Sequence, residues 1–220
     1  MKIDPKSALA NCETLMLDMD GTVLDLAYDM YIWMHHVPEQ YAARHGMEFE
    51  HARDKLYAKF REMLGQLEWY CLDHWSDFLD IDVAAIHREH NDRIGYLPGA
   101  EDFLKSVSRL DKRLLLVSNL HAETLEIKNE KTGITQYFDG IHLSHEFGHP
   151  KETQLFWQAL AERENFDPAT TLFVDDNAAV LGSARTYGIG VLLEVMHPDT
   201  SAEPKAESEF SGIGGVIELV

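Results

Sequence analysis

Residues 100–193 alternate between short apolar runs and amphipathic segments, and this alternation limits the fold more than any other feature of the chain. It predicts helices over 100–110, 122–132, 152–164 and 178–187, and strands over 113–117, 140–143, 171–174 and 189–193. An earlier apolar run, residues 14–17, adds a first strand. Alternating strands and helices form a parallel sheet with right-handed crossovers and helices on both faces. The sequence therefore predicts an α/β fold with a doubly wound parallel sheet.

Residues 24–97 interrupt this alternation. The block is rich in Ala, Met, Leu, Glu, Arg and aromatic residues and contains a single proline, Pro38. Its periodicity predicts four helices, over about 27–45, 50–65, 68–79 and 83–94, with Gly46 and Gly65 ending the first two. We therefore expect two domains: a sheet core of residues 1–23 and 98–220, and a helical domain of residues 24–97 inserted after the first strand. Residues 197–215 are expected to be mostly loop.

Two carboxylates, Asp18 and Asp20, directly follow the first strand. In an extended chain, residues two apart point to the same side, and Gly21 then allows a sharp turn. Carboxylates this close repel each other unless a cation lies between them. A hard divalent cation with oxygen ligands, Mg²⁺ above all, meets this need. A carboxylate beside Mg²⁺ can also attack a phosphoryl group.

The stretch Asp18-Met19-Asp20-Gly21-Thr22 resembles the first signature of the haloacid dehalogenase (HAD) superfamily, most of whose members are phosphatases. Residues 113–119 are similar to the second signature, a strand ending in Ser or Thr. Residues 147–152 resemble the third, which supplies a Lys, and residues 171–177 the fourth, a strand ending in an acidic pair. The chain is therefore identified as a HAD phosphohydrolase with a Rossmann-like core, and the inserted helices resemble the helical cap of that superfamily.

The resemblance implies a role for each signature. Asp18 is the nucleophile that forms an aspartyl-phosphate, and Asp20 is the general acid and base. Haloacid dehalogenases lack an acid at the Asp20 position, so its presence favours phosphoryl transfer. Lys151 would neutralise the nucleophile and the phosphoryl group. Ser118 and the backbone N–H of Asn119 would bind phosphoryl oxygens, although Ser118 is equally read as the cap of the following helix.

The resemblance also implies the ligands of Mg²⁺. These are Asp18, the backbone carbonyl of Asp20, and Asp176 as the direct ligand of the acidic pair. Adjacent strand residues point oppositely, so Asp175 and Asp176 cannot be equal ligands without a local bend. Asp175 would act through water or hold Lys151.

Two aromatic segments of the cap, residues 26–33 and 67–75, look similar to the purine nucleotidase branch of the superfamily, which dephosphorylates GMP and IMP. The resemblance implies a 5′-nucleotidase acting on purine monophosphates. At least half of these aromatic side chains should simply pack the cap. Tyr28, Arg44 and Trp69 are candidates for contact with the leaving group.

Three other readings stay open. One is a capped HAD phosphatase or mutase that acts on a sugar phosphate or on phosphoglycolate. Another, of a different class, is a non-enzymatic Mg²⁺-dependent phospho-switch like a response-regulator receiver, against which stand the insertion and the second aspartate. The third is a scaffold that keeps the motifs without activity.

Charge and composition limit the kinds of molecule that the protein can bind. The formal net charge of −19 argues against binding to nucleic-acid polymers, whose affinity comes from Lys and Arg. No apolar run approaches the roughly 20 residues that cross a bilayer, and residues 1–7 lack the apolar core of a signal peptide. Cys12 and Cys71 are read as reduced thiols. We therefore expect a cytoplasmic enzyme of a small phosphomonoester, with no membrane partner; the oligomeric state is not predicted.

Overall fold

The computed structural model describes residues 3–220 and contains a six-stranded parallel sheet. The strands lie in the order β3-β2-β1-β4-β5-β6, and every pairing between neighbours is parallel. Their bounds are β1 Thr14–Leu17, β2 Arg113–Ser118, β3 Gly140–Leu143, β4 Thr171–Asp175, β5 Val191–Val195 and β6 Ser211–Ile213. The strand order reverses between β1 and β4. Ligand sites of such sheets lie at this reversal, beyond the carboxyl ends of the strands.

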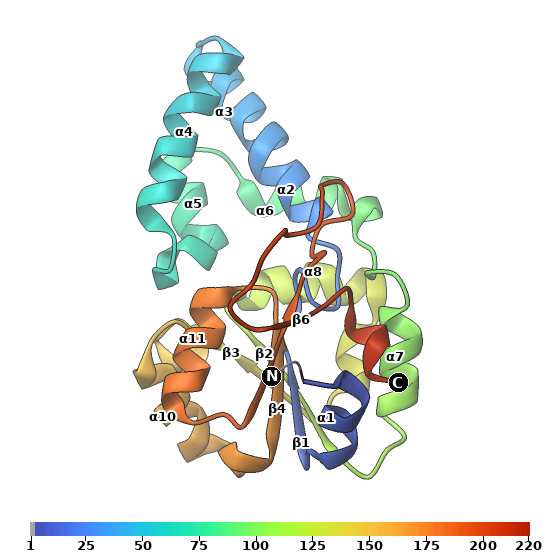
Figure 1. Ribbon diagram of the computed structural model, residues 1–220. Coiled ribbons are helices and arrows are strands. Elements are labelled where there is room, and N and C mark those ends of the chain that lie inside the picture. The colour runs from blue at the N-terminus through green and yellow to red at the C-terminus, as the bar shows by residue number, and fades with distance from the viewer. Residues whose placement is uncertain (1–2) are drawn as a thin grey trace.

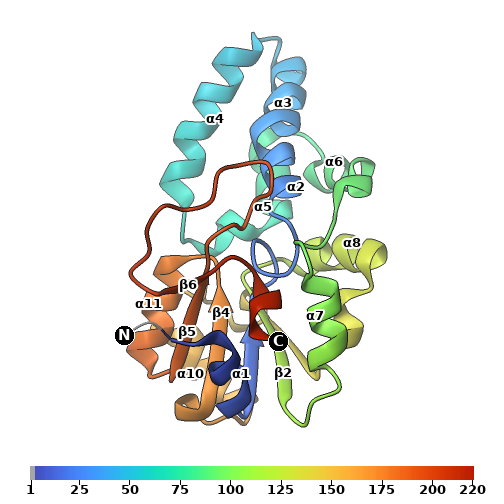
Figure 2. The same cartoon turned by 45° about the vertical axis from the view of Figure 1, so that its right-hand side comes forward.

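Helices cover both faces of the sheet (Figures 1 and 2). One face carries α1 Pro5–Asn11, α7 Ala100–Val107 and α8 Ala122–Thr132, and the other carries α10 Gln154–Arg163 and α11 Ala178–Tyr187. The short helix α9, Ser144–Phe147, follows β3. Alternate residues of β1 pack on opposite faces of the sheet. Leu15 and Leu17 belong to the hydrophobic core on the α1, α7 and α8 face, and Met16 belongs to the core on the α10 and α11 face. Burial on both faces explains why the strands read as continuous apolar runs.

Of the α-helices between β1 and β2 in sequence, all but α7 stand over the carboxyl edge of the sheet (Figure 1). They are α2 Ala27–Tyr31, α3 Val37–His45, α4 Phe49–Met63, α5 Leu72–Leu79 and α6 Val83–Glu89. Their own core centres on Trp75, which is fully buried, with Phe60 packed edge-on against it at 5.1 Å between ring centroids. We call this helical insertion the cap.

The two segments that join the cap to the sheet core run side by side. Leu24 and Tyr96 form an antiparallel bridge. The N–H of Asp25 donates to the carbonyl of Gly95 at 2.9 Å, and the N–H of Leu97 donates to that of Val23 at 2.9 Å. The long C-terminal loop reaches the same place, where the N–H of Thr200 donates to Asp25 Oδ1 at 3.1 Å. Figure 2 shows this loop rising from the sheet toward the base of the cap.

The predicted fold class, an α/β doubly wound sheet with an inserted helical cap, is confirmed. Several element bounds differ from prediction. The helix expected over 68–79 is divided at Cys71, whose backbone is extended (φ −97°, ψ 112°), into a 3₁₀ turn and α5. The helix expected over 27–45 is unbroken but has a π-helical turn at Ile32–His36. Gly46 ends α3 in the left-handed conformation (φ 62°), as predicted.

The chain ends are more structured than predicted. Helix α1 was not predicted; its start is set by Asp4, whose carboxylate accepts a hydrogen bond from the N–H of Ser7 at 2.9 Å. Strand β6 lies within the stretch expected to be loop, and its three residues with a central Gly212 leave too little pattern to detect. No helix among residues 3–220 is both long and apolar enough to cross a membrane.

Candidate active site

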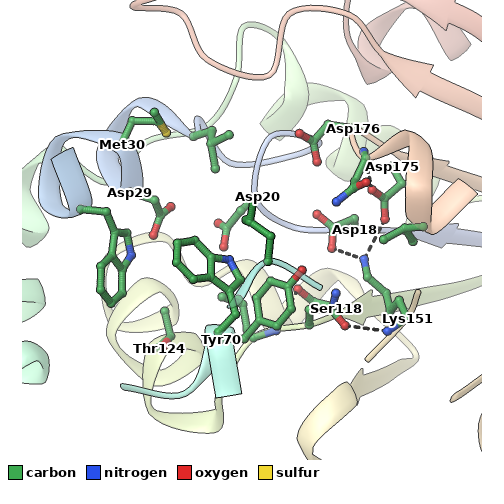
Figure 3. Close-up of a pocket in the computed structure, with 18 of the residues that line it drawn as sticks. Asp18, Asp20, Asp29, Met30, Tyr70, Ser118, Thr124, Lys151, Asp175 and Asp176 are labelled. Carbon is green, nitrogen blue, oxygen red and sulfur yellow. Dashed lines mark hydrogen bonds and ion pairs between the residues drawn. The ribbon is translucent and has the colours of Figure 1, made fainter. Parts of the chain in front are cut away.

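Asp18 and Asp175 meet at the carboxyl edge of the sheet, where the strand order reverses (Figure 3). Asp18 follows β1 and Asp175 ends β4, and these two strands are neighbours. The N–H of Asp18 donates to the carbonyl of Val174 at 3.0 Å, which extends the β1–β4 ladder by one residue. Both side chains are buried. The fold therefore places two carboxylates from distant parts of the chain side by side.

Lys151 lies between these two carboxylates. Its Nζ is 2.5 Å from Asp18 Oδ1, 2.7 Å from Asp175 Oδ2 and 3.1 Å from the carbonyl oxygen of Val117. The backbone N–H of Lys151 donates to Asn119 Oδ1 at 2.9 Å, so the loop is tied to the end of β2. Burial alone would lower the pKa of Lys151, but the two carboxylates outweigh it and the net shift is upward. Lys151 is therefore a fixed positive charge beside Asp18, the predicted nucleophile.

Asp18, Asp175 and Asp176 form an acidic cluster, with one carboxylate oxygen of each within 4.8 Å of the others. Burial, and then the neighbouring acids, raise the pKa of Asp176 well above its usual range. Burial and Asp18 raise the pKa of Asp175 to about 7, against the lowering effect of Lys151. Three carboxylates around one ammonium favour a further cation, and all-oxygen donors suit Mg²⁺. The residues present therefore fit the ion that the family resemblance implies.

Gly21 makes room for this cluster. Its φ of 78° lies in the left-handed region, and a Cβ there would stand 2.8 Å from Asp176 Cγ. Any other residue would be strained and would push the carboxylate away.

Asp20 points to a different cation. Its Oδ2 is 2.7 Å from Nζ of Lys128, and the same ammonium is 2.7 Å from Asp29 Oδ2. The prediction that one cation lies between Asp18 and Asp20 is therefore wrong for their side chains. The reason is local: β1 ends at Leu17 and the chain turns at once, so strand alternation no longer applies. Burial, opposed by Lys128 and assisted by Asp29, raises the pKa of Asp20 to about 7.

Lys128, which pairs with Asp20 and Asp29, was not predicted from the sequence. It is 1% exposed and lies in the middle of α8. Its neighbours Glu126, Glu130 and Lys131 give the helix the appearance of a solvated surface. A single lysine within such a segment carries no sequence signal of burial.

Ser118 and Asn119 lie at the end of β2, beside Lys151, and both side chains are buried. The residue that precedes α8 is His121, so Ser118 is not the cap of that helix. Asn119 Nδ2 donates to Glu152 Oε2 at 3.0 Å, and Glu152 Oε1 accepts from the hydroxyl of Tyr70 at 2.9 Å. Tyr70 belongs to the cap, so this pair of bonds links the cap to the sheet core.

A cavity of about 290 Å³ extends from the acidic cluster into the cap. Its cap side is mainly apolar, with Met30, Trp33, Met34, Leu64, Trp69 and Leu72. Three residues that line this cavity have a buried polar atom without a hydrogen-bond partner within the described part of the chain: Asp20 Oδ1, His87 Nε2 and Thr124 Oγ1. These atoms are candidates for hydrogen bonds to a ligand.

The three candidates for leaving-group contact have different positions. Trp69 lines the cavity. Tyr28 is buried beside it, where its hydroxyl donates to the carbonyl of His87 at 2.7 Å, and it does not line the cavity. Arg44 is exposed near the end of α3 and pairs with Asp80 at 2.6 Å. Helical periodicity indicates which face a residue occupies but not how far along the cap it lies, so Arg44 could not be excluded from sequence.

The described fold and acidic cluster define a capped α/β hydrolase. The chain belongs to the haloacid dehalogenase-like hydrolase family, whose sequence model matches residues 15–193. It is 36% identical to the GMP/IMP nucleotidase YrfG of Escherichia coli over 213 residues, which cover 97% of this chain and 96% of that protein. The resemblance stated from the motifs is thereby confirmed.

Solved structures share the same fold. A HAD phosphatase from Thermococcus onnurineus matches with a TM-score of 0.78 at 16% identity, over 94% of this chain and 95% of that one. The L-2-haloacid dehalogenase from Xanthobacter autotrophicus matches with a TM-score of 0.59 at 17% identity, over 94% and 96%. Because enzymes of two chemistries share the fold, the site residues must decide the reaction.

Proposed function

We propose that this protein is a Mg²⁺-dependent phosphomonoester hydrolase that works through an aspartyl-phosphate on Asp18. The observation that carries the proposal is the grouping of Asp18, Lys151 and the Asp175–Asp176 pair at one sheet edge, with Asp20 beside them. Asp20 has a pKa of about 7, so it can both give and take a proton near neutral pH.

In the proposed first step, a carboxylate oxygen of Asp18 forms a bond to phosphorus while the bond from phosphorus to the ester oxygen breaks. Protonated Asp20 gives its proton to that departing oxygen, so the alcohol leaves neutral. In the second step, water attacks phosphorus and loses a proton to Asp20. Inorganic phosphate leaves, and the Asp18 carboxylate is restored.

Lys151 and the end of β2 would stabilise the negative charge. The Lys151 ammonium already contacts Asp18 and would offset charge on the transferring group, with Ser118 and the N–H of Asn119 as further donors. Asp18, Asp176 and the backbone carbonyl of Asp20 would hold Mg²⁺, and Asp175 would position Lys151. When bound, Mg²⁺ supplies charge neutralisation at the phosphoryl oxygens.

We propose a purine 5′-monophosphate, GMP or IMP, as the substrate. The E. coli relative carries this activity in its name. The wall provided by Trp33 and Trp69 suits the face of a purine base, whereas a sugar rich in hydroxyls would need more polar partners.

His87 offers a reason for preferring 6-oxopurines. The Tyr28 hydroxyl has one proton, which it donates to the carbonyl of His87, since a carbonyl can only accept. The contact of 3.0 Å between that hydroxyl and His87 Nδ1 then requires a hydrogen on Nδ1. Burial lowers the pKa of His87 to about 4, so the ring is neutral and Nε2 is an acceptor. Guanine and hypoxanthine present an N1–H donor, and adenine does not.

We further propose residues 24–97 as a mobile cap domain, with residues 1–23 and 98–220 as the core. The linkers 24–26 and 95–99 would act as hinges, supported by their pairing at one narrow junction. Opening would admit the substrate, and closing would exclude water.

The decisive experiment measures phosphate release, with Mg²⁺ and with EDTA, from GMP, IMP, AMP, UMP, phosphoglycolate and several sugar phosphates. We expect Mg²⁺-dependent release led by GMP and IMP, and its loss in Asp18→Asn but not in the exposed control Asp111→Asn. Release led by a sugar phosphate would retain the mechanism and reject the substrate. A long-lived phosphoprotein without turnover would favour the phospho-switch instead.

A separate experiment tests the preference for 6-oxopurines. It compares His87→Leu with a control variant, His35→Leu, in which the substituted residue is exposed. Loss of one hydrogen bond to the base should reduce kcat/KM for GMP and IMP about tenfold and leave that for AMP unchanged. An equal reduction for all three nucleotides would remove His87 as the discriminating residue.

A further inference from the structure

A second group of metal-ligating side chains lies outside the acidic cluster. Cys71, Asp73 and His121 each offer one ligand atom, and these atoms lie within 4.8 Å of one another. Cys71 precedes α5 and Asp73 lies in its first turn, whereas His121 precedes α8. The group therefore joins the cap to the sheet core. Its members flank Leu72 and Leu120, which line the cavity, so it lies next to the cavity wall.

Two imidazole nitrogens at this place have no hydrogen-bond partner among residues 3–220. They are Nδ1 of His121 and Nε2 of His145, and both are buried. The two rings meet edge to face with their centroids 5.1 Å apart. Buried polar atoms are normally paired, and those that are not call for a cause such as a ligand. A metal ion bound through Nδ1 would supply the missing partner for His121.

The donor set selects a different ion from that of the acidic cluster. A thiolate and an imidazole are poor ligands for Mg²⁺, whereas Zn²⁺ and similar ions take sulfur, nitrogen and carboxylate together. Bonds to Zn²⁺ are about 2.0–2.3 Å long, so ligand atoms of one tetrahedral site lie roughly 3.3–3.8 Å apart. The net charge of −19 also favours cations near the surface.

We infer that Cys71, Asp73 and His121 bind a thiophilic divalent ion such as Zn²⁺, which clasps the cap to the sheet core. The ligands come from both sides of the proposed cap junction, so the ion binds only when they are together. Binding must then stabilise the closed arrangement by the same free energy that closure contributes to binding. The inference does not depend on the identity of the substrate.

The test uses the full-length protein, freed of metal and kept in excess Mg²⁺, and titrates it with Co²⁺ as a spectroscopic substitute for Zn²⁺. A cobalt–thiolate bond gives a charge-transfer absorption in the near ultraviolet. The chain has two cysteines, and Cys12 lies between α1 and β1, at the opposite edge of the sheet from the site. Cys12→Ser should keep the absorption, and Cys71→Ser should lose it.

His121→Gln keeps the thiol and tests the second ligand. We expect its affinity for Co²⁺ to fall at least about tenfold, and Asp73→Asn to weaken binding while Asp77→Asn, exposed on the same helix, does not. No charge-transfer absorption in the parent protein, or an absorption that survives in Cys71→Ser, would overturn the site. Circular dichroism of each variant shows that it is folded.

Hydrogen exchange tests the clasp itself. The amides of Asp25 and Leu97 bond across the two linkers, so Zn²⁺ should slow their exchange in the parent protein and not in Cys71→Ser or His121→Gln. Metal binding without slower exchange would retain the site and overturn the clasp. Because both readouts are independent of turnover, an inactive enzyme would not be mistaken for a missing metal site.

Discussion

Two buried lysines, Lys151 and Lys128, form ion pairs with carboxylates at the candidate active site. The two lysines connect different regions of the molecule. Lys151 is 2% exposed and joins Asp18 to Asp175, both in the sheet core. Lys128 is 1% exposed and joins Asp20 of the core to Asp29, which lies in α2 of the cap. One cluster is complete within the core, and the other is complete only when cap and core meet.

This difference separates nucleophilic attack, proposed for Asp18, from proton transfer, proposed for Asp20. The charge that faces the proposed nucleophile does not depend on the position of the cap. The proton affinity of the proposed acid does, because Asp29 raises the pKa of Asp20 and Lys128 lowers it. Closure of the cap would therefore fix the pKa of Asp20 when the substrate is enclosed. Four measurements test this contrast.

The largest effect is expected for Lys151→Met. Removing one partner of a buried ion pair costs about 3–5 kcal/mol of unfolding free energy, and here two carboxylates lose their ammonium. Turnover should fall about 10³-fold, the upper end of the loss expected when one preorganised donor is removed. Urea unfolding and phosphate release measure the two effects. Asp18→Asn should lose turnover while keeping the fold, so equal destabilisation of both variants would contradict the assignment.

Lys128→Met should reduce turnover about 10²-fold, the low end of what a positioned acid contributes, and should change its pH dependence. The ratio kcat/KM should fall as the pH rises through about 7, where Asp20 loses its proton. Because Lys128 lowers the pKa of Asp20, its removal should move this fall to higher pH. Lys131→Met, exposed on the same helix, is the control. An unchanged alkaline limb would show that Asp20 is not the group that titrates.

The acidic cluster should make stability depend on pH and Mg²⁺. Asp175 has a folded pKa of about 7, well above that of an unfolded aspartate, so the folded protein binds more protons between about pH 4 and 7. Without metal, the unfolding free energy should therefore decrease as the pH rises through this window. Mg²⁺ at 100 times its Kd should restore about 2.7 kcal/mol, or roughly 5–10 °C in Tm, at pH 8, and far less at pH 5.

Asp175→Asn provides the matched comparison for this experiment. It should flatten the dependence of Tm on pH, whereas Asp111→Asn should not. If both variants behave like the parent protein, general repulsion among the acidic side chains is the cause.

The smallest effect is expected for Tyr70→Phe. It removes the hydroxyl that donates to Glu152 across the cap junction at 2.9 Å, a bond worth about 0.5–1.5 kcal/mol. KM should rise about two- to tenfold with little change in kcat. Tyr57→Phe, which removes a bond to the carbonyl of Met34 inside the cap, should leave KM unchanged. A rise in KM for Tyr57→Phe but not for Tyr70→Phe would show that the closed state depends on contacts inside the cap and not on the bond between Tyr70 and Glu152.

The sheet and its acidic cluster could be predicted because their signal is local. A strand ending in acids places those acids at the sheet edge, so Asp18, Asp175 and Asp176 meet as the motifs predicted. The cap resisted prediction because contacts there depend on how helices cross. Lys128 resembles a surface lysine, and Arg44 and Trp69 lie on helical segments whose reach toward the cavity is a tertiary property.

The position of β1 at the centre of the sheet has a consequence for synthesis of the chain. Its two neighbours, β2 and β4, are made after the whole cap and after most of the core, respectively. At about 5–20 residues per second, the first strand leaves the ribosome on the order of ten seconds before β4 follows. Until β2 is made, Leu15, Met16 and Leu17 have no strand to pair with, and until β4 is made Asp18 lacks Asp175 beside it. The strand that precedes the proposed nucleophile is made before both of its neighbours, so a nascent chain is expected to need protection of this segment until β4 has followed.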